Sequence, residues 1–277
     1  MLKDLKRLLI ITLTTPIKPG SIHRFMSENE FELRMIEALE ILDSMDNSYK
    51  KGKDLALGNI NAQSLSLGHI IGETLKKSFE TTNERPLVGF AASSIVLSTI
   101  EGYVDTSKED ALKNFNSLLT RIVYRSSSQD AKELVVSMED IGLSKYLNLL
   151  ENNDITIESI EYENRTLGDL FEILSKIDTG FMLNLKDYSY FLKLSKTLQG
   201  YKNMMLASLK AYLSIAGDIM KISDMGKFNI FDDSSFSKLS LLDKNYKKMR
   251  DDLNGILGGV LISLYFLNKS EIPLKLI

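Results

Sequence analysis

The segment from Thr15 to Phe25 gathers residues that could do chemistry. It contains two of the four prolines, one of the two histidines, and the cations Lys18 and Arg24. Proline fixes φ and glycine accepts positive φ, so we expect a rigid loop with Ile17 and Lys18 extended and Gly20 left-handed. Such a loop suits a phosphate, because its cations and backbone N–H groups lose little conformational entropy on binding. A rigid connector between two helices is the alternative.

A second group of polar residues lies in the stretch 58–69, which is rich in glycine and amide side chains. Asn59, Asn61 and Ser66 precede an apolar helical pattern, and a loop at a helix N-terminus can offer hydrogen-bond donors to a nucleotide. Ordinary loop and capping roles for the two asparagines are the alternative.

The two histidines differ in their surroundings. His69 falls on the apolar face of the helical pattern that follows, which predicts a packed core histidine. His23 stands beside Arg24 in the loop, and is the better candidate for acid or base chemistry or for hydrogen bonding to a substrate.

The loop also resembles a known signature. The run Pro16-Ile17-Lys18-Pro19-Gly20-Ser21-Ile22-His23-Arg24-Phe25 is similar to the first motif of the triphosphoribosyl-dephospho-CoA synthase family, which reads Pro-x-Lys-Pro-Gly-x-Val-x-Arg. The resemblance implies an all-helical transferase that joins the triphosphoribosyl group of ATP to dephospho-CoA and releases adenine. It further implies that phosphate is held by Lys18, Gly20, Ser21 and Arg24.

Other segments match the family less closely. Residues 166–178 resemble a family segment that ends in an aspartate, and Asp178 matches that aspartate. Near the C-terminus the family has Asn-Pro-Gly-Thr-x-Ala-Asp; here Asn254 matches, and Val260 stands where the aspartate would be. Ser66 to Gly68 resembles the end of an Asn-Thr-x-x-Gly motif loosely, and the mid-chain Pro-Gly-Gly-Leu-Gly run is absent.

The resemblance implies ATP and a dephospho-CoA-like acceptor as ligands, with Mg²⁺ on the triphosphate. His23 and Asp178 are the catalytic candidates, and Asp178 is also the candidate metal ligand. Glu73 and Glu101 are acids that could replace the missing aspartate. Because acids are missing, a second hypothesis stays open: a non-catalytic helical protein that keeps the fold and serves as a nucleotide sensor or an interaction subunit.

Several elements must position these residues. Helix start signals, a hydroxyl followed three positions later by an acid, recur at Ser27, Thr106 and Thr166. Residues 1–11 lack a small-residue cleavage site and predict a first core helix rather than a signal peptide. The stretch Ile155 to Ile160 alternates like a strand without a partner, and predicts an extended connector.

The remaining apolar patterns are helical. Residues Leu87 to Tyr103 carry no charge until Glu101, which predicts a central helix packed on most sides. Residues 188–222 and 236–268 predict two long helices, with glycines as points of bending or close packing.

The composition of the chain limits the class of protein it can form. The chain has 277 residues, 44% of them hydrophobic, and a net charge of −3, so it can bury a large core and has no electrostatic footprint for nucleic acid. It has no cysteine, which excludes disulfides and thiolate metal sites. The sequence therefore predicts a single all-α, multi-helix domain over residues 1–277 with a buried central helix. We expect a cytoplasmic protein without a membrane role, and a homo-oligomer stays open.

Overall fold

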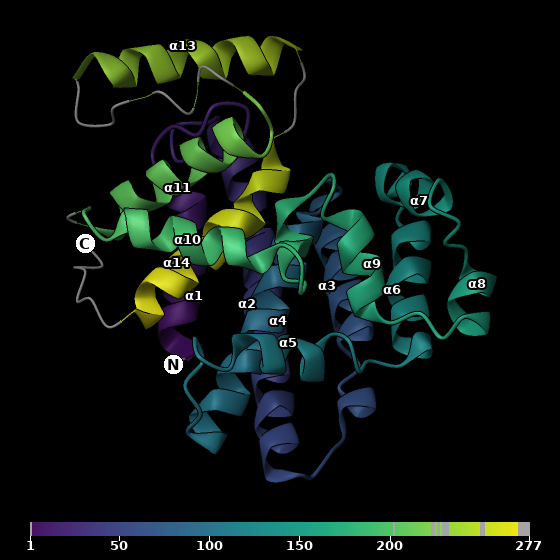
Figure 1. Ribbon diagram of the computed structural model, residues 1–277. Helices are drawn as coiled ribbons and strands as arrows, with labels where there is room; N and C mark the ends of the chain where they lie inside the picture. Colours follow the sequence, from purple (N-terminus) through teal and green to yellow (C-terminus); the bar gives the residue numbers. More distant parts are fainter. Residues whose placement is uncertain are drawn as a thin grey trace.

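The computed structural model describes residues 2–201, 203–222, 225, 228, 233–249 and 253–270. Over these residues the chain forms thirteen α-helices and no strand, which confirms the all-α prediction (Figure 1). The helices are α1 (Leu2–Thr14), α2 (Glu28–Leu57), α3 (Leu67–Thr82), α4 (Val88–Ser107), α5 (Phe115–Ile122), α6 (Ser128–Asp140), α7 (Ser144–Glu151), α8 (Ile157–Tyr162), α9 (Leu167–Leu174), α10 (Tyr188–Leu198), α11 (Met204–Asp218), α13 (Asp233–Met249) and α14 (Leu257–Lys269). Three short 3₁₀ turns are η1 (Ala62–Ser64), η2 (Thr179–Met182) and η3 (Asn254–Ile256).

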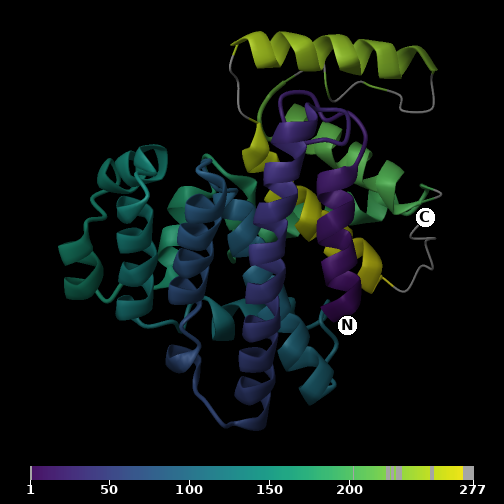
Figure 2. The same ribbon diagram turned by 180° about the vertical axis from the view of Figure 1, so that it is seen from behind.

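Helix α4 is the predicted central helix. Every residue from Val88 to Tyr103 is buried, as expected of a helix that is apolar on all sides. Seen from behind, α1, α2, α3 and α6 form a row, and α4 lies behind α2 (Figure 2). Helix α14 packs on α4 as well, and it in turn contacts α10 and α11.

Two glycines let α2 and α4 approach closely. A Cβ on Gly52 of α2 would lie 2.0 Å from the carbonyl oxygen of Thr99 in α4. A Cβ on Gly102 of α4 would lie 2.0 Å from the carbonyl oxygen of Tyr49 in α2. The backbones are therefore in direct contact at this crossing, and only glycine fits there without a shift of the helices.

Two of the three helix start signals are confirmed. Ser27 precedes α2 and donates to Glu30 Oε2 at 2.6 Å, although it forms no side-chain capping bond to the backbone. Thr166 and Asp169 form a complete capping box at the start of α9. The signal at Thr106 was wrong, because Thr106 lies within α4 and its hydroxyl donates to the Gly102 carbonyl at 3.0 Å.

The connector and the two long helices also differ from expectation. Thr156 and Ser159 form a capping box that starts α8, so the predicted extended stretch is helical from Ile157 onward. The pattern 188–222 is divided into α10 and α11, with Gly200 between them and Asn203 capping the second helix. The pattern 236–268 is divided into α13 and α14.

Helix α1 confirms the predicted first core helix, since Leu5, Leu8, Leu9 and Leu13 are buried. In the part of the chain that the structure describes, no helix combines the length and the apolar character needed to cross a bilayer.

Candidate ligand-binding site

The Thr15–Phe25 loop begins at the C-terminal end of α1, where one helix carbonyl lacks its usual backbone N–H donor. Pro16 has no N–H, so it cannot donate to the carbonyl of Thr12, four residues earlier. The Lys18 side chain is fully buried, and its Nζ donates to this carbonyl instead. Burial lowers the pKa of Lys18 well below its usual value. Lys18 therefore caps α1 from inside the fold, and its ammonium group is not open to a ligand in this structure.

The backbone of the loop agrees with the prediction at one residue and not at another. Gly20 has a φ of +74°, the left-handed conformation predicted for it, and its N–H donates to Asp243 Oδ1 at 3.0 Å. Ile17 was predicted to be extended, and this was wrong: its φ is +27°. The turn at Ile17 directs the chain back toward the end of α1, where the Lys18 side chain enters the core.

His23 and Arg24 have different positions. His23 is buried; its Nδ1 accepts from the Phe25 N–H at 3.1 Å, and its Nε2 lies 3.1 Å from Asp243 Oδ2. His23 and Gly20 thus both connect the loop to α13 through Asp243. Arg24 is exposed and forms no ion pair with any residue that the structure describes.

The loop also meets the segment before α14. Ser21 Oγ and the Ile22 N–H both donate to Asn254 Oδ1, at 2.9 and 3.1 Å. The Leu253 N–H donates to the Gly20 carbonyl at 2.9 Å. The two segments that resemble the first and last family motifs therefore lie against one another.

Asp178 closes the N-terminal end of α4. Its Oδ2 accepts from the Gly89 N–H at 3.0 Å and from the Tyr146 hydroxyl at 2.8 Å, and its Oδ1 accepts from the Gly180 N–H at 3.0 Å. The first N–H groups of a helix lack partners within the helix, and negative charge is stabilised beside them. Gly89 permits this contact, because a Cβ there would lie 2.0 Å from Asp178 Oδ1.

A second buried carboxylate accepts a hydrogen bond at the same end of α4. Glu37 Oε1 accepts from the Leu87 N–H at 2.5 Å, and Glu37 Oε2 accepts from Arg34 Nη1 at 2.9 Å. Burial raises the pKa of Glu37, while the charge of Arg34 acts in the opposite direction. Helix α4 therefore begins between two buried acids that come from distant parts of the chain.

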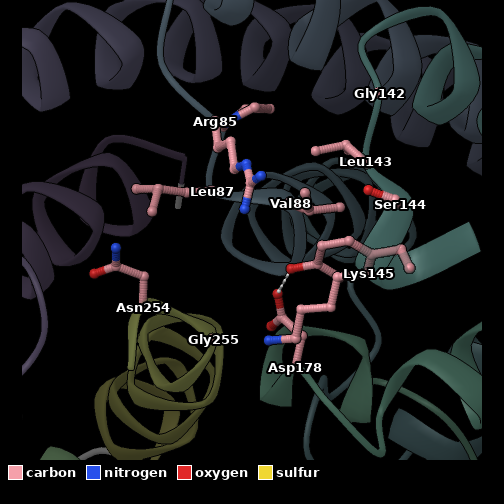
Figure 3. A pocket seen from close by; sticks show the side chains of 12 residues that line it. Arg85, Leu87, Val88, Gly142, Leu143, Ser144, Lys145, Asp178, Asn254 and Gly255 are labelled. Carbon is pink, nitrogen blue, oxygen red and sulfur yellow. Dashed lines mark hydrogen bonds between the residues drawn. The ribbon is translucent and has the colours of Figure 1, made fainter. Parts of the chain in front are cut away.

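A small pocket of about 70 Å³ opens beside Asp178 (Figure 3). The side chains of Arg85 and Lys145 point into it toward Asp178, and Asn254 lies across from Lys145 (Figure 3). We call it the Arg85 pocket; it is lined by Arg85, Pro86, Leu87, Val88, Gly142, Leu143, Ser144, Lys145, Tyr146, Asp178, Asn254 and Gly255. Pockets for drug-sized ligands have about 300–1,000 Å³, so this one has room for a small group rather than a whole nucleotide.

The electrostatics of the Arg85 pocket are mixed. Burial raises the pKa of Asp178 to about 6, against the lowering effect of its hydrogen bonds and of the Lys145 charge. Arg85 and Lys145 are exposed, and neither forms an ion pair within the described ranges. The pocket therefore offers two available cations beside one acid that changes its protonation near pH 6. Perturbed acids of this kind are concentrated at functional sites.

Asn59, Asn61 and Ser66 lie elsewhere. Asn61 caps η1 and, with Arg125, lines a second pocket of about 580 Å³ at the start of α6. The Arg85 pocket lies just beyond the other end of α6, and a helix of this length spans about 20 Å. Asn59 donates to Asp54 at 3.1 Å, and Ser66 precedes α3 without a side-chain capping bond. The structure therefore does not join these residues to the Arg85 pocket.

The other acids and the second histidine are also outside the pocket. The side chain of His69 is 56% exposed, with Nδ1 3.3 Å from Glu133 Oε2, so the core position predicted for it was wrong. Glu101 is buried, and its Oε1 lies 2.6 Å from Lys269 Nζ. Glu73 lies 3.7 Å from Lys76 on the surface of α3.

The predicted metal ligand is already engaged. Within the described residues no group of three or more His, Asp or Glu side chains could hold a metal ion. Both oxygens of Asp178 accept hydrogen bonds from protein donors. The residues beside the Arg85 pocket therefore fit a protein-held Mg²⁺ poorly.

Sequence reasoning missed Arg85, Lys145 and Tyr146. The dipeptide Arg85-Pro86 directly precedes the predicted central helix, and a cation at such an entry was a usable signal. No local pattern marks Lys145 or Tyr146, because only the packing of α7 against the segment before η2 brings them to Asp178.

Comparison with known proteins adds no relative: no protein-family model matches the chain, and neither a curated protein nor a solved structure matches it. At this level the protein is an all-helical protein with a polar pocket at the entrance of its central helix.

Proposed function

We propose that this protein binds ATP or a related phosphorylated nucleotide, with a phosphate group in the Arg85 pocket, and that it acts as a divergent triphosphoribosyl-dephospho-CoA synthase-like transferase. One observation carries the proposal. Two segments that resemble family motifs, represented by Asp178 and Asn254, line one pocket although they are far apart in the sequence, and Ser21 of a third such segment donates to Asn254.

The binding part of the proposal is supported by the two available cations. Arg85 can offer a planar pair of donors to phosphate oxygens, and Lys145 adds a second positive charge. The pocket volume of about 70 Å³ suits one phosphate group. The sugar and base would then extend outside, over the exposed surface around Gly142 and Ser144. Arg24 is exposed in the Thr15–Phe25 loop, whose Ser21 contacts Asn254 of the pocket, and it is available to a ligand that extends in that direction.

In the transfer step, Asp178 is the proposed base. An acceptor hydroxyl attacks the anomeric carbon of the ribose, a C–O bond forms there, and the C–N bond to adenine breaks. The hydroxyl proton needs a base, and the departing adenine takes up a proton. With a pKa of about 6, Asp178 can accept a proton at neutral pH. Mg²⁺, when bound to the triphosphate, would supply charge neutralisation.

A second function is favoured by the scarcity of acids. Among the described residues that line the Arg85 pocket, Asp178 is the only carboxylate, and Lys18 is buried as a helix cap. A protein with these features can bind a phosphorylated nucleotide without displacing adenine. This is the non-catalytic sensor or interaction protein of the second hypothesis.

Calorimetric titration with ATP tests the binding, with and without Mg²⁺. Arg85→Ala and Lys145→Ala should each weaken ATP binding about tenfold to a hundredfold, because hydrogen bonds to charged groups contribute about 1.5–3 kcal/mol. Lys113→Ala is the matched control, since Lys113 has a side chain that is 83% exposed and does not line the pocket. Equal affinity of all four proteins would refute the assignment of the pocket.

Chromatography of the same mixtures after addition of dephospho-CoA separates the two functions. Release of adenine that depends on Asp178 would establish the transferase. ATP binding without adenine release would establish the non-catalytic alternative, and absence of binding would remove both.

A further inference from the structure

A groove of about 900 Å³ is lined by residues of α1 and α2, which lie side by side in Figure 2. Its apolar floor includes Ile10 and Ile11 of α1 and Leu42 of α2. Beyond the groove, α2 carries two further exposed apolar side chains at three-residue steps before Leu42: Leu39, which is 60% exposed, and Ile36, which is 37% exposed. An apolar groove with further exposed apolar side chains beside it marks an interaction surface rather than scattered surface residues.

The two sides of the groove carry opposite charge. The α1 side has Lys3, Lys6 and Arg7. Over residues 32–46 the α2 side has accessible acids, and its one cation is Arg34, which is paired with a buried acid. The accessible acids of this α2 segment are Glu32, Glu40, Asp43 and Asp46. The face is therefore basic along one helix, apolar in the middle, and acidic along the other helix.

Two contacts fix how these charges are aligned. Lys6 Nζ lies 2.7 Å from Asp46 Oδ2, so the cationic end of α1 is level with the Asp43–Asp46 turn of α2. Arg7 is one residue further along α1, and its link to Asp4 is a long 3.6 Å. Lys3 and Asp43 are exposed and have no ion-pair partner in the part of the chain that the structure describes. The Lys3 and Asp43 charges lie near the aligned turns of α1 and α2 and remain available to a binding partner.

We propose that this face is the contact between two copies of the chain, related by a two-fold axis that runs parallel to α1 and α2. Rotation about that axis places α1 of one copy against α2 of the other, and two-fold contacts must be self-complementary in this way. Arg7 of each copy then faces Asp43 of the other, and the apolar strips meet between them. An acidic helix from another protein would be attracted by α1 and repelled by α2, so a second copy fits the face better.

The size of the face sets the strength of the contact. Two helices side by side, each about 10 Å across, cover a width of about 20 Å, and residues 32–46 extend about 22 Å at 1.5 Å per residue. The resulting area of about 450 Å² per copy is well below the about 800 Å² of a standard interface. The dimer is therefore a weak, reversible one that forms at high protein concentration.

Sedimentation equilibrium over about a hundredfold range of concentration tests the proposal on the full chain. Arg7→Glu and Asp43→Lys each place like charges opposite one another at both symmetry-related contacts, so each should weaken self-association about tenfold. An equimolar mixture of the two variants should restore it, because the mixed dimer has Glu opposite Lys at one contact and Arg opposite Asp at the other. Leu39→Ala should weaken the dimer as well, by removal of apolar contact.

Lys113→Glu provides the control, because its side chain is 83% exposed and is not part of the groove. All of the substituted side chains are exposed, and circular dichroism checks that the variants fold. A chain that stays monomeric at every concentration would overturn the proposal. So would a dimer that both charge variants leave unchanged, or variants whose mixture fails to associate.

Discussion

The buried carboxylate of Asp178 makes the stability of the protein depend on pH in a direction that can be tested. Its pKa rises from the usual 3.8 to about 6, with burial as the main cause. The folded state then holds the proton more tightly than the unfolded state does. This contribution to stability is complete below about pH 4, and it is lost as the pH rises through about 6. The full difference corresponds to about 3 kcal/mol, at 1.36 kcal/mol per pKa unit.

The substitution Asp178→Asn removes the titration and keeps the shape. Asparagine cannot accept at both ends of its amide, so one buried donor loses its partner, at a cost of about 1–3 kcal/mol that does not vary with pH. The stability of the wild type minus that of Asp178→Asn isolates the carboxylate, because all other titrating groups cancel. We expect this difference to fall by about 2 kcal/mol between about pH 4.5 and about pH 7.5.

Urea unfolding followed by circular dichroism at a series of pH values measures this difference. Asp154→Asn is the matched control, because the exposed Asp154 side chain is hydrated in both the folded and the unfolded state. If the difference for Asp178→Asn stayed constant to within about 0.5 kcal/mol, the buried carboxylate would not carry the linkage and the reasoning would fail.

Two further predictions concern packing and capping. Gly52→Ala should destabilise the protein by about 3 kcal/mol or more, because its Cβ would lie 2.0 Å from the Thr99 carbonyl oxygen. Gly200→Ala is the control, because a Cβ there meets nothing within 4 Å. It should change the free energy of unfolding by less than about 1 kcal/mol in the same urea experiment. Lys18→Met removes a buried amine whose pKa is lowered by burial. The unfolded state therefore binds that proton more tightly, and the stability of the wild type relative to Lys18→Met should rise with pH. If this difference in unfolding free energy did not vary with pH, the Lys18 amino group would lie in a hydrated site and the reasoning would fail.

The elements that sequence predicted well are those with strong local signals. The central helix followed from an uncharged run of residues, and the α9 capping box followed from Thr166 and Asp169. The failures had competing local signals: the alternation at 155–160 concealed the Thr156–Ser159 capping box, and Thr106 could satisfy its hydroxyl within α4. Periodicity alone could not show the break between α10 and α11, because both helices carry the same apolar spacing.

The candidate site was predictable only in pieces. Asp178 and Asn254 were visible as matches to separate motifs, but nothing in the sequence places them at one pocket. The Arg85 pocket depends on α7, which delivers Lys145 and Tyr146 from a segment without any motif. The position of Lys18 depends on which donor Pro16 removes, and this required the path of the loop after α1.

The interaction of Lys18 with the end of α1 also changes how the proline-lysine-proline-glycine motif should be understood in comparisons between sequences. Pro16 creates an unfilled acceptor and Lys18 fills it, while Gly20 and Ser21 attach the loop to α13 and to Asn254. Each residue thus has a folding role that is independent of any ligand. A chain can therefore need these residues for the fold of its N-terminal loop alone, so their presence in a sequence is by itself evidence neither of a bound phosphate nor of a reaction.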